Sequence, residues 1–62
     1  MKVRVIKPFR HRVRFFEVGE VGEVVTVEHP LIWDGKLLYD FYVEFPDYEP
    51  IGVNKYEVEE VI

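Results

Sequence analysis

The chain has 62 residues, of which 48% are hydrophobic and none is cysteine, and its formal net charge is −4 at pH 7. This length is that of one domain, residues 1–62, and so short a domain buries only about 60% of the surface that its unfolded chain exposes. The composition excludes disulfides, thiolate catalysis and cysteine-ligated zinc, and the size leaves no room for a deep substrate pocket beside a core.

The same features indicate where the protein acts. No apolar run approaches the roughly 20 residues that are needed to cross a bilayer. The segment 1–5 alternates charged and β-branched residues, so it lacks the continuous apolar stretch of a signal peptide. Because a small domain without disulfides suits a reducing compartment, we expect a cytoplasmic protein that has no membrane contact.

The first predicted strand covers residues 2–6, where valines alternate with Lys2 and Arg4. A period of two predicts a strand with one buried face, because successive side chains leave opposite sides of the pleat. Pro8 ends the strand, since proline cannot donate a hydrogen bond to the ladder.

Six of the eight cations lie within the first 14 residues, and no acid interrupts them. All twelve acids follow, opposed by only two lysines. This asymmetry fits a basic face for an anionic partner. It also fits a basic N-terminal segment that lies against the acidic remainder of the same sheet, since opposite charges commonly pair across strands. The six cations are Lys2, Arg4, Lys7, Arg10, Arg12 and Arg14.

The segment 9–20 is predicted to be a long, partly extended loop that folds back over one mouth of a small barrel. Its apolar residues keep no single period, and arginines are interleaved with them. A connection of this length in a small domain is usually functional or packed by its own side chains. We expect its arginines to face outward and its apolar side chains to face inward, namely Phe9, Val13, Phe15, Phe16 and Val18.

A second strand is predicted over residues 23–28, followed by a hairpin connection over 29–36. Within this connection, Asp34-Gly35 predicts a two-residue type I′ turn, because both central positions of that turn need a positive φ. The apolar residues 31–33 before the turn would extend the second strand as a protruding arm.

The central strand is predicted over residues 38–45. Aromatic and β-branched residues suit a pleated surface that is half buried. Strict alternation gives this strand one apolar face, which should line the inside of the barrel and consists of Tyr39, Phe41, Val43 and Phe45.

The remaining residues predict a loop over 46–50, a short strand over 51–53, a 3₁₀ turn over 54–56 and a closing strand over 58–62. Together these elements predict an all-β fold, a five-stranded small barrel with a long first loop and one 3₁₀ turn before the last strand. Such a barrel leaves few free strand edges.

Three stretches follow a pattern that is shared with a known group of folds. They are Val18-Gly19 to Val27 at the start of the second strand, Tyr42-Val43-Glu44-Phe45, and Gly52-Val53-Asn54 leading to residues 57–61. This pattern resembles the SH3-like small barrels, and among them the type that is found in photosystem I. The resemblance spans nearly the whole chain and implies the fold, whereas one fold can host many functions.

The sequence contains none of the common signatures of catalysis. It has no serine, no P-loop and no dinucleotide-binding glycine motif. His11 and His29 lack the local spacing of a zinc site, and the acids at 17, 20 and 23 fit a solvated loop. We therefore expect a protein that is not an enzyme and that needs no metal, cofactor or small-molecule substrate.

The first functional hypothesis is a non-catalytic binding module that docks on another protein or a larger complex through its loops. Arginine, tryptophan and tyrosine are the side chains most enriched at interface hot spots. The alternative is structural: two aromatic residues of the patch would cap the core, and its arginines would pair with Glu17 or Glu20. The candidate binding residues are Phe9, Arg10, Arg12, Arg14, Trp33 and Tyr48.

The second functional hypothesis is nucleic-acid binding by the basic N-terminal strand and loop. The six cations would contact phosphates, and Phe9 and Phe15 between them would be available for stacking. Against this hypothesis stand the acidic remainder of the chain and the sequence pI of about 5.0, since a typical nucleic-acid-binding domain is strongly basic.

Overall fold

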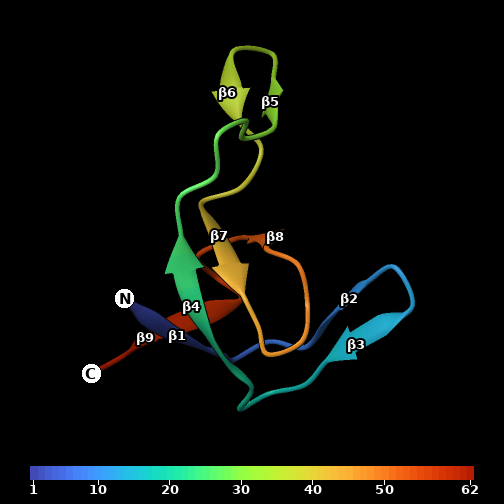
Figure 1. Cartoon of the computed structure of the whole chain (residues 1–62), viewed down its shortest axis with the longest axis vertical. Coiled ribbons are helices and arrows are strands. Elements are labelled where there is room, and N and C mark those ends of the chain that lie inside the picture. The colour runs from blue at the N-terminus through green and yellow to red at the C-terminus, as the bar shows by residue number, and fades with distance from the viewer.

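The computed structural model describes all residues, 1–62, and contains nine β-strands and no helix (Figure 1). Without a helix, the chain has no helical segment that could cross a membrane. The strands are β1 (Lys2–Val5), β2 (Phe9–His11), β3 (Arg14–Phe16), β4 (Val21–Val25), β5 (Ile32–Trp33), β6 (Lys36–Leu37), β7 (Phe41–Glu44), β8 (Ile51–Val53) and β9 (Val58–Val61).

Five strands form one antiparallel sheet in the order β8-β7-β4-β1-β9. The strands β4, β7 and β8 make a meander, and β9 returns to pair with β1. The sheet curls into a half-barrel whose outer edges, on β8 and β9, have no partner strand (Figure 1). The prediction of an all-β fold is therefore confirmed.

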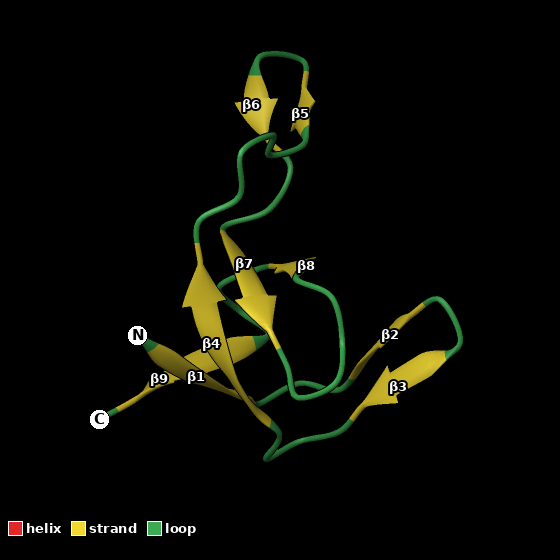
Figure 2. Ribbon diagram, in the orientation of Figure 1, coloured by secondary structure: helices red, strands yellow, loops and turns green.

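Two hairpins project from this half-barrel in different directions, as Figure 2 shows. One consists of β2 and β3, and the other consists of β5 and β6. They leave opposite ends of the sheet, so the candidate binding residues are divided between two separate protrusions.

The core lies in the concave side of the half-barrel. The alternation of β1 and β7 turns every second side chain inward, as a period of two requires. The largest core side chains are two phenylalanines, one at the end of β3 and one just after β7. The core consists of Val3, Val5, Phe16, Val43, Phe45, Ile51, Val53 and Val58.

The predicted apolar face of the central strand is confirmed. Val43 and Phe45 are buried, whereas Phe41 and Tyr39 are half-buried and Glu44 is exposed. The strand β7 is shorter than the predicted 38–45 because the residues before it leave the sheet toward the β5–β6 hairpin.

The prediction of an irregular loop over 9–20 is wrong in its first half, which forms the β2–β3 hairpin. Its two strands pair in register, with Phe9 opposite Phe16, and they are joined by a two-residue turn at Arg12 and Val13. That turn contains none of the residues that usually mark a hairpin. No local signal therefore indicates that the period of two runs up one strand and down the other.

The inward orientation expected for the apolar residues of this segment holds only at the base of the hairpin. Phe16 is buried and Phe9 packs against the core, whereas Val13, Phe15 and Val18 are exposed. The reason is geometric, since a hairpin that projects from a small barrel can bury only the side chains at its base.

The chain reversal before β9 is a single hydrogen-bonded turn. The N–H of Glu57 donates to the Asn54 carbonyl oxygen at 2.9 Å, and the N–H of Asn54 donates to Glu57 Oε1 at 2.9 Å. The first of these bonds spans three residues, as in a 3₁₀ helix, but no helix continues from it.

Candidate functional site

Phe9 and Phe16, paired across the base of the β2–β3 hairpin, attach it to the core. Their rings stack with centroids 5.0 Å apart and an interplanar angle of 19°. Phe16 also contacts Phe45 and Tyr48, with ring centroids 4.7 and 5.5 Å away. Phe9 is thus held in a structural contact, as the alternative interpretation of the patch expected.

Arg14 and Tyr48 close the same cluster from above. The guanidinium of Arg14 lies 4.0 Å from the centroid of the Phe16 ring and 5.5 Å from that of Tyr48. Its Nη2 donates to Glu20 Oε1 at 2.8 Å, whereas its Nη1 is buried without a hydrogen-bond partner. Because a guanidinium over an aromatic face is attracted by the ring quadrupole, Arg14 holds the hairpin in place.

His11 is a member of this cluster that the sequence did not indicate. The Tyr48 hydroxyl lies 2.9 Å from His11 Nδ1 and 3.3 Å from the His11 carbonyl oxygen. Since residues two apart on a strand share a face, His11 follows from Phe9 once the hairpin is recognised. Tyr48 is therefore occupied by contacts within the chain rather than presented to a partner.

The tip of the β2–β3 hairpin is its exposed part. Val13 is 94% exposed, and Arg10 lies over the ring of Phe15 on the outward face, 5.9 Å from its centroid. Arg12 has a φ of 57° and pairs with Glu49 at 3.2 Å between two exposed side chains. A left-handed backbone is strained for any residue with a Cβ, so Arg12 occupies its turn position at a cost of about 1 kcal/mol or more.

The β5–β6 hairpin carries the strongest exposed feature of the chain. Residues 31–38, which we call the apolar arm, hold six apolar or glycine residues and only Asp34 and Lys36 as charges. The predicted type I′ turn is confirmed, since φ is 53° at Asp34 and 74° at Gly35. The large apolar side chains of the arm are all exposed, namely Leu31, Ile32, Trp33, Leu37 and Leu38.

Trp33 lies near the tip of the apolar arm and is 77% exposed. It does not cap the core, and it does not join Arg10 and Arg12, because the arm and the β2–β3 hairpin point away from each other (Figure 1). The single patch predicted around Trp33 and the arginines is therefore divided in two. The sequence signal for the arm was the run of leucine, isoleucine and tryptophan around Asp34-Gly35, of which only Trp33 was selected.

A narrow apolar groove of about 210 Å³ lies at the base of the apolar arm. Its walls come from the end of β4, the start of β7 and the two chain segments that lead into the arm; they include Val25, Val27, Pro30 and Tyr39. One hydrogen bond fixes the arm here, from the Leu31 N–H to the hydroxyl of Tyr42 at 2.8 Å.

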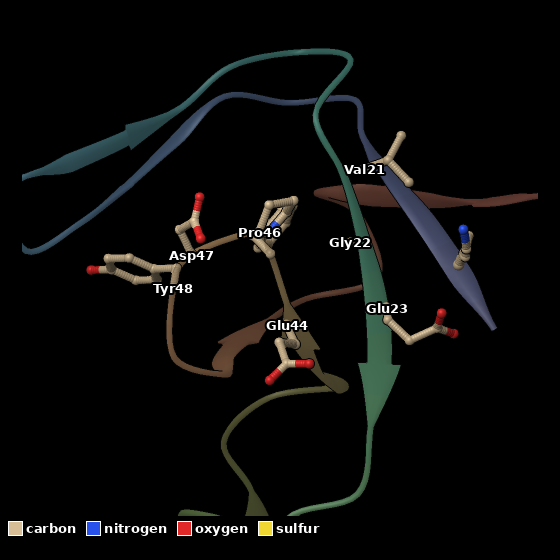
Figure 3. A pocket seen from close by; sticks show the side chains of 9 residues that line it. Val21, Gly22, Glu23, Glu44, Pro46, Asp47 and Tyr48 are labelled. Carbon is tan, nitrogen blue, oxygen red and sulfur yellow. The ribbon is translucent and has the colours of Figure 1, made fainter.

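A wider open groove of about 500 Å³ lies between β4, β7 and the loop after β7 (Figure 3). It is lined by Glu23, Glu44 and Asp47, whose carboxylates point away from one another in Figure 3. No three histidine, aspartate or glutamate side chains of the chain gather as a metal ion would require. The N-terminal ammonium of Met1 donates to Glu23 Oε2 at 2.9 Å, and this hydrogen bond is the main cause of a lowered Glu23 pKa.

Three of the six N-terminal cations are paired with acids of the same chain. Arg4 pairs with Glu59 directly across β1 and β9, and Arg12 and Arg14 have the partners described above. The remaining three, Lys2, Lys7 and Arg10, form no ion pair, and Lys7 lies 5.4 Å from the ring centroid of Tyr56. The cations are thus interleaved with acids rather than gathered in one continuous basic face.

Comparison with protein-family models, with curated proteins and with solved structures finds no match for this chain. Its function consequently has to be inferred from the two hairpins and their surfaces.

Proposed function

We propose that this protein is a non-catalytic binding module that docks on another protein or on a larger complex through its two projecting hairpins. The apolar arm supplies the main contact. The exposed tip of the β2–β3 hairpin, with Arg10, Arg12, Val13 and Phe15, supplies a second contact of mixed basic and apolar character.

The observation that carries this proposal is the exposure of the whole apolar arm. Single exposed apolar residues are ordinary on protein surfaces, but contiguous apolar patches mark interaction sites. Five large apolar side chains gathered on eight residues form such a patch, and a tryptophan at its tip is the residue type most enriched among hot spots.

The strained turn at Arg12 supports the second contact. Non-glycine residues in the left-handed region persist where the surrounding structure or a function requires them. At this tip neither Val13 nor Arg12 is held by packing, and the only partner of Arg12 is the exposed Glu49. A role in recognition accounts for an arginine in a position that glycine would occupy without strain.

The fold is compatible with this proposal. The strand order, with the last strand beside the first, agrees with the resemblance to SH3-like barrels of the photosystem I type, and we propose that the half-barrel belongs to that fold group. In such a small scaffold, projecting loops rather than a cavity offer the area for recognition. We further propose a cytoplasmic location, without a membrane partner.

The proposal is tested by site-specific photo-crosslinking in the cells that produce the protein. A photoreactive phenylalanine analogue replaces Trp33 in one variant and Tyr56, an exposed aromatic residue outside both hairpins, in a control variant. We expect a discrete adduct from position 33 and none from position 56. No adduct at position 33, or the same adducts at both positions, would refute the proposal.

A stability measurement complements this experiment. Because Trp33 contacts little of its own chain, Trp33→Ala should change the free energy of unfolding by less than about 0.5 kcal/mol. A larger loss would place Trp33 in the structural framework and remove it from the binding surface.

A further inference from the structure

The apolar arm has no face that its own chain could cover. Its paired residues place Ile32 and Leu37 on one face and Trp33 and Lys36 on the other, so each face carries large apolar side chains. All four of these side chains are exposed. An isolated two-stranded hairpin is marginally stable in water, and this one is joined to the half-barrel only at its base. A second surface must therefore cover the arm.

A surface of matching character exists on the same molecule. Seven of the ten residues that line the groove at the base of the arm are hydrophobic, and its volume of about 210 Å³ is suited to one large side chain. The groove contains a single charged group, the carboxylate of Asp40. Tyr39, one of its walls, is fixed because its ring lies against the backbone of Gly52.

We propose that two copies of the chain associate through their apolar arms, each inserting Trp33 into the groove at the base of the other arm. This inference rests on the proposed function of the arm and identifies its partner as a second copy. When two arms lie antiparallel about a two-fold axis, the tip of each meets the base of the other. A two-fold interface requires such self-complementarity, in which one patch carries both the inserted residue and its receptor.

The charges of the arm and the groove are complementary in this arrangement. Lys36 next to the tip forms no ion pair within its own chain, whereas Asp40 lies at the base. One oxygen of Asp40, Oδ2, accepts the N–H of Lys55 at 2.8 Å, so the other is available for the partner's Lys36. The arm itself has no net charge, and the repulsion expected between two chains of charge −4 is therefore not concentrated there.

The first test uses the single tryptophan as its own reporter. In a dilution series of the wild-type chain, indole emission should shift to shorter wavelength as concentration rises, with sedimentation velocity showing a monomer–dimer equilibrium. We expect a dissociation constant of about 1–100 μM, as a small interface gives. A wild-type chain that stays monomeric up to about 1 mM would overturn the inference.

Sedimentation of two alanine variants locates the interface. Trp33→Ala should weaken dimerisation at least about 30-fold, as a hot spot does. Phe15→Ala, which removes an exposed aromatic ring from the other hairpin, should leave it unchanged. Equal effects of the two substitutions would contradict an interface formed by the arms.

Charge reversal tests the reciprocal geometry. In Lys36→Glu dimers two acids would meet at each contact, and in Asp40→Lys dimers two lysines would meet, so each variant alone should be monomeric. An equimolar mixture should dimerise again, because the two contacts of a mixed dimer are both of opposite charge. Failure of folded variants to complement each other would overturn the arrangement. If Asp40→Lys does not fold, contacts between Trp33 and Val27 in a half-labelled wild-type sample, measured by isotope-filtered NMR, decide the same question.

The photo-crosslinking experiment separates this inference from the proposed function. An adduct at position 33 with the mass of two chains, each of 7.5 kDa, supports both. An adduct with a different protein only would retain the proposed function and overturn the second copy as partner. No adduct would overturn both.

Discussion

Phe16 joins the β2–β3 hairpin to the half-barrel, and replacing it tests how the two parts are coupled. Its ring is fully buried and contacts the rings of Phe9, Phe45 and Tyr48 and the guanidinium of Arg14. A 62-residue domain has a free energy of unfolding of only about 3–9 kcal/mol. Phe16→Ala, at about 3–5 kcal/mol, would remove most of it, so Phe16→Leu is the informative change.

Phe16→Leu keeps an apolar side chain in place but removes the ring. Each aromatic pair contributes about 0.5–1.5 kcal/mol beyond its buried area, and the contact with Arg14 contributes about 0.5–2 kcal/mol. Because these contributions share one ring and are not additive, we expect a total loss of about 2–3 kcal/mol. The neighbouring Phe15→Leu changes an exposed ring on the outward face and should cost less than about 0.5 kcal/mol.

Urea unfolding at 25 °C measures both variants. With a slope of about 1 kcal/mol/M for so small a domain, Phe16→Leu should lower the midpoint by about 2–3 M and Phe15→Leu by less than about 0.5 M. A cycle that combines Phe16→Leu with Arg14→Met should give a coupling energy of about 0.5–2 kcal/mol. Equal costs of the two leucine variants, or no coupling, would show that the hairpin is not anchored through Phe16.

Four further predictions concern other parts of the chain. Gly52→Ala should lower the unfolding free energy by about 1–3 kcal/mol, since its Cβ would lie 2.1 Å from Tyr39 Cδ2, and in a Tyr39→Ala background urea unfolding should show less than half of that cost. Arg12→Gly should raise it by up to about 1 kcal/mol in the same assay, because glycine tolerates the φ of 57°; a loss would contradict the strain. The lowered pKa of Glu23, caused mainly by the hydrogen bond from the Met1 ammonium, contributes stability above the ordinary glutamate pKa that is lost as pH falls through the lowered value. Glu23→Gln should flatten the stability profile in that acidic range, and an unchanged profile would refute the link. A filter-binding titration with single-stranded nucleic acid should show no strong, steeply salt-dependent binding, since three of the six cations are paired; such binding would restore the nucleic-acid hypothesis.

The sequence predicts those elements whose signal is local. Alternation identified the first strand and the inward face of β7, and Asp34-Gly35 identified a type I′ turn that the structure has. In each case the residues that determine the structure are adjacent in the chain. The same holds for the short strand β8, whose bounds are those predicted from residues 51–53.

The β2–β3 hairpin could not be predicted because its determinants are distant or atypical. Its turn lacks glycine and asparagine, and its inward face is defined by contacts with Tyr48, a residue 32 positions beyond Phe16. The same tertiary contacts explain why Arg14 was predicted to face outward. An arginine between two aromatic residues can stack or be solvated, and only the position of the partner ring decides which occurs.

The candidate site was predicted by residue type, and residue type does not distinguish structural from exposed members. Of the six binding residues, Phe9, Arg14 and Tyr48 are held within the aromatic cluster, whereas Arg10, Arg12 and Trp33 are exposed. The four aliphatic residues of the apolar arm were missed as binding residues because leucine and isoleucine next to a predicted turn are ordinarily core residues.

The two hairpins differ in how they are attached, and this difference assigns them different roles. The β2–β3 hairpin shares stacked rings, a cation–π contact and hydrogen bonds with the core, so it unfolds only with the domain. The apolar arm is attached through the Leu31–Tyr42 hydrogen bond and a few contacts at its base, so it can open locally while the sheet remains intact. An element that is apolar, exposed and weakly attached gains most of its stability from whatever covers it. The arm is therefore the part of this protein whose order depends on its partner.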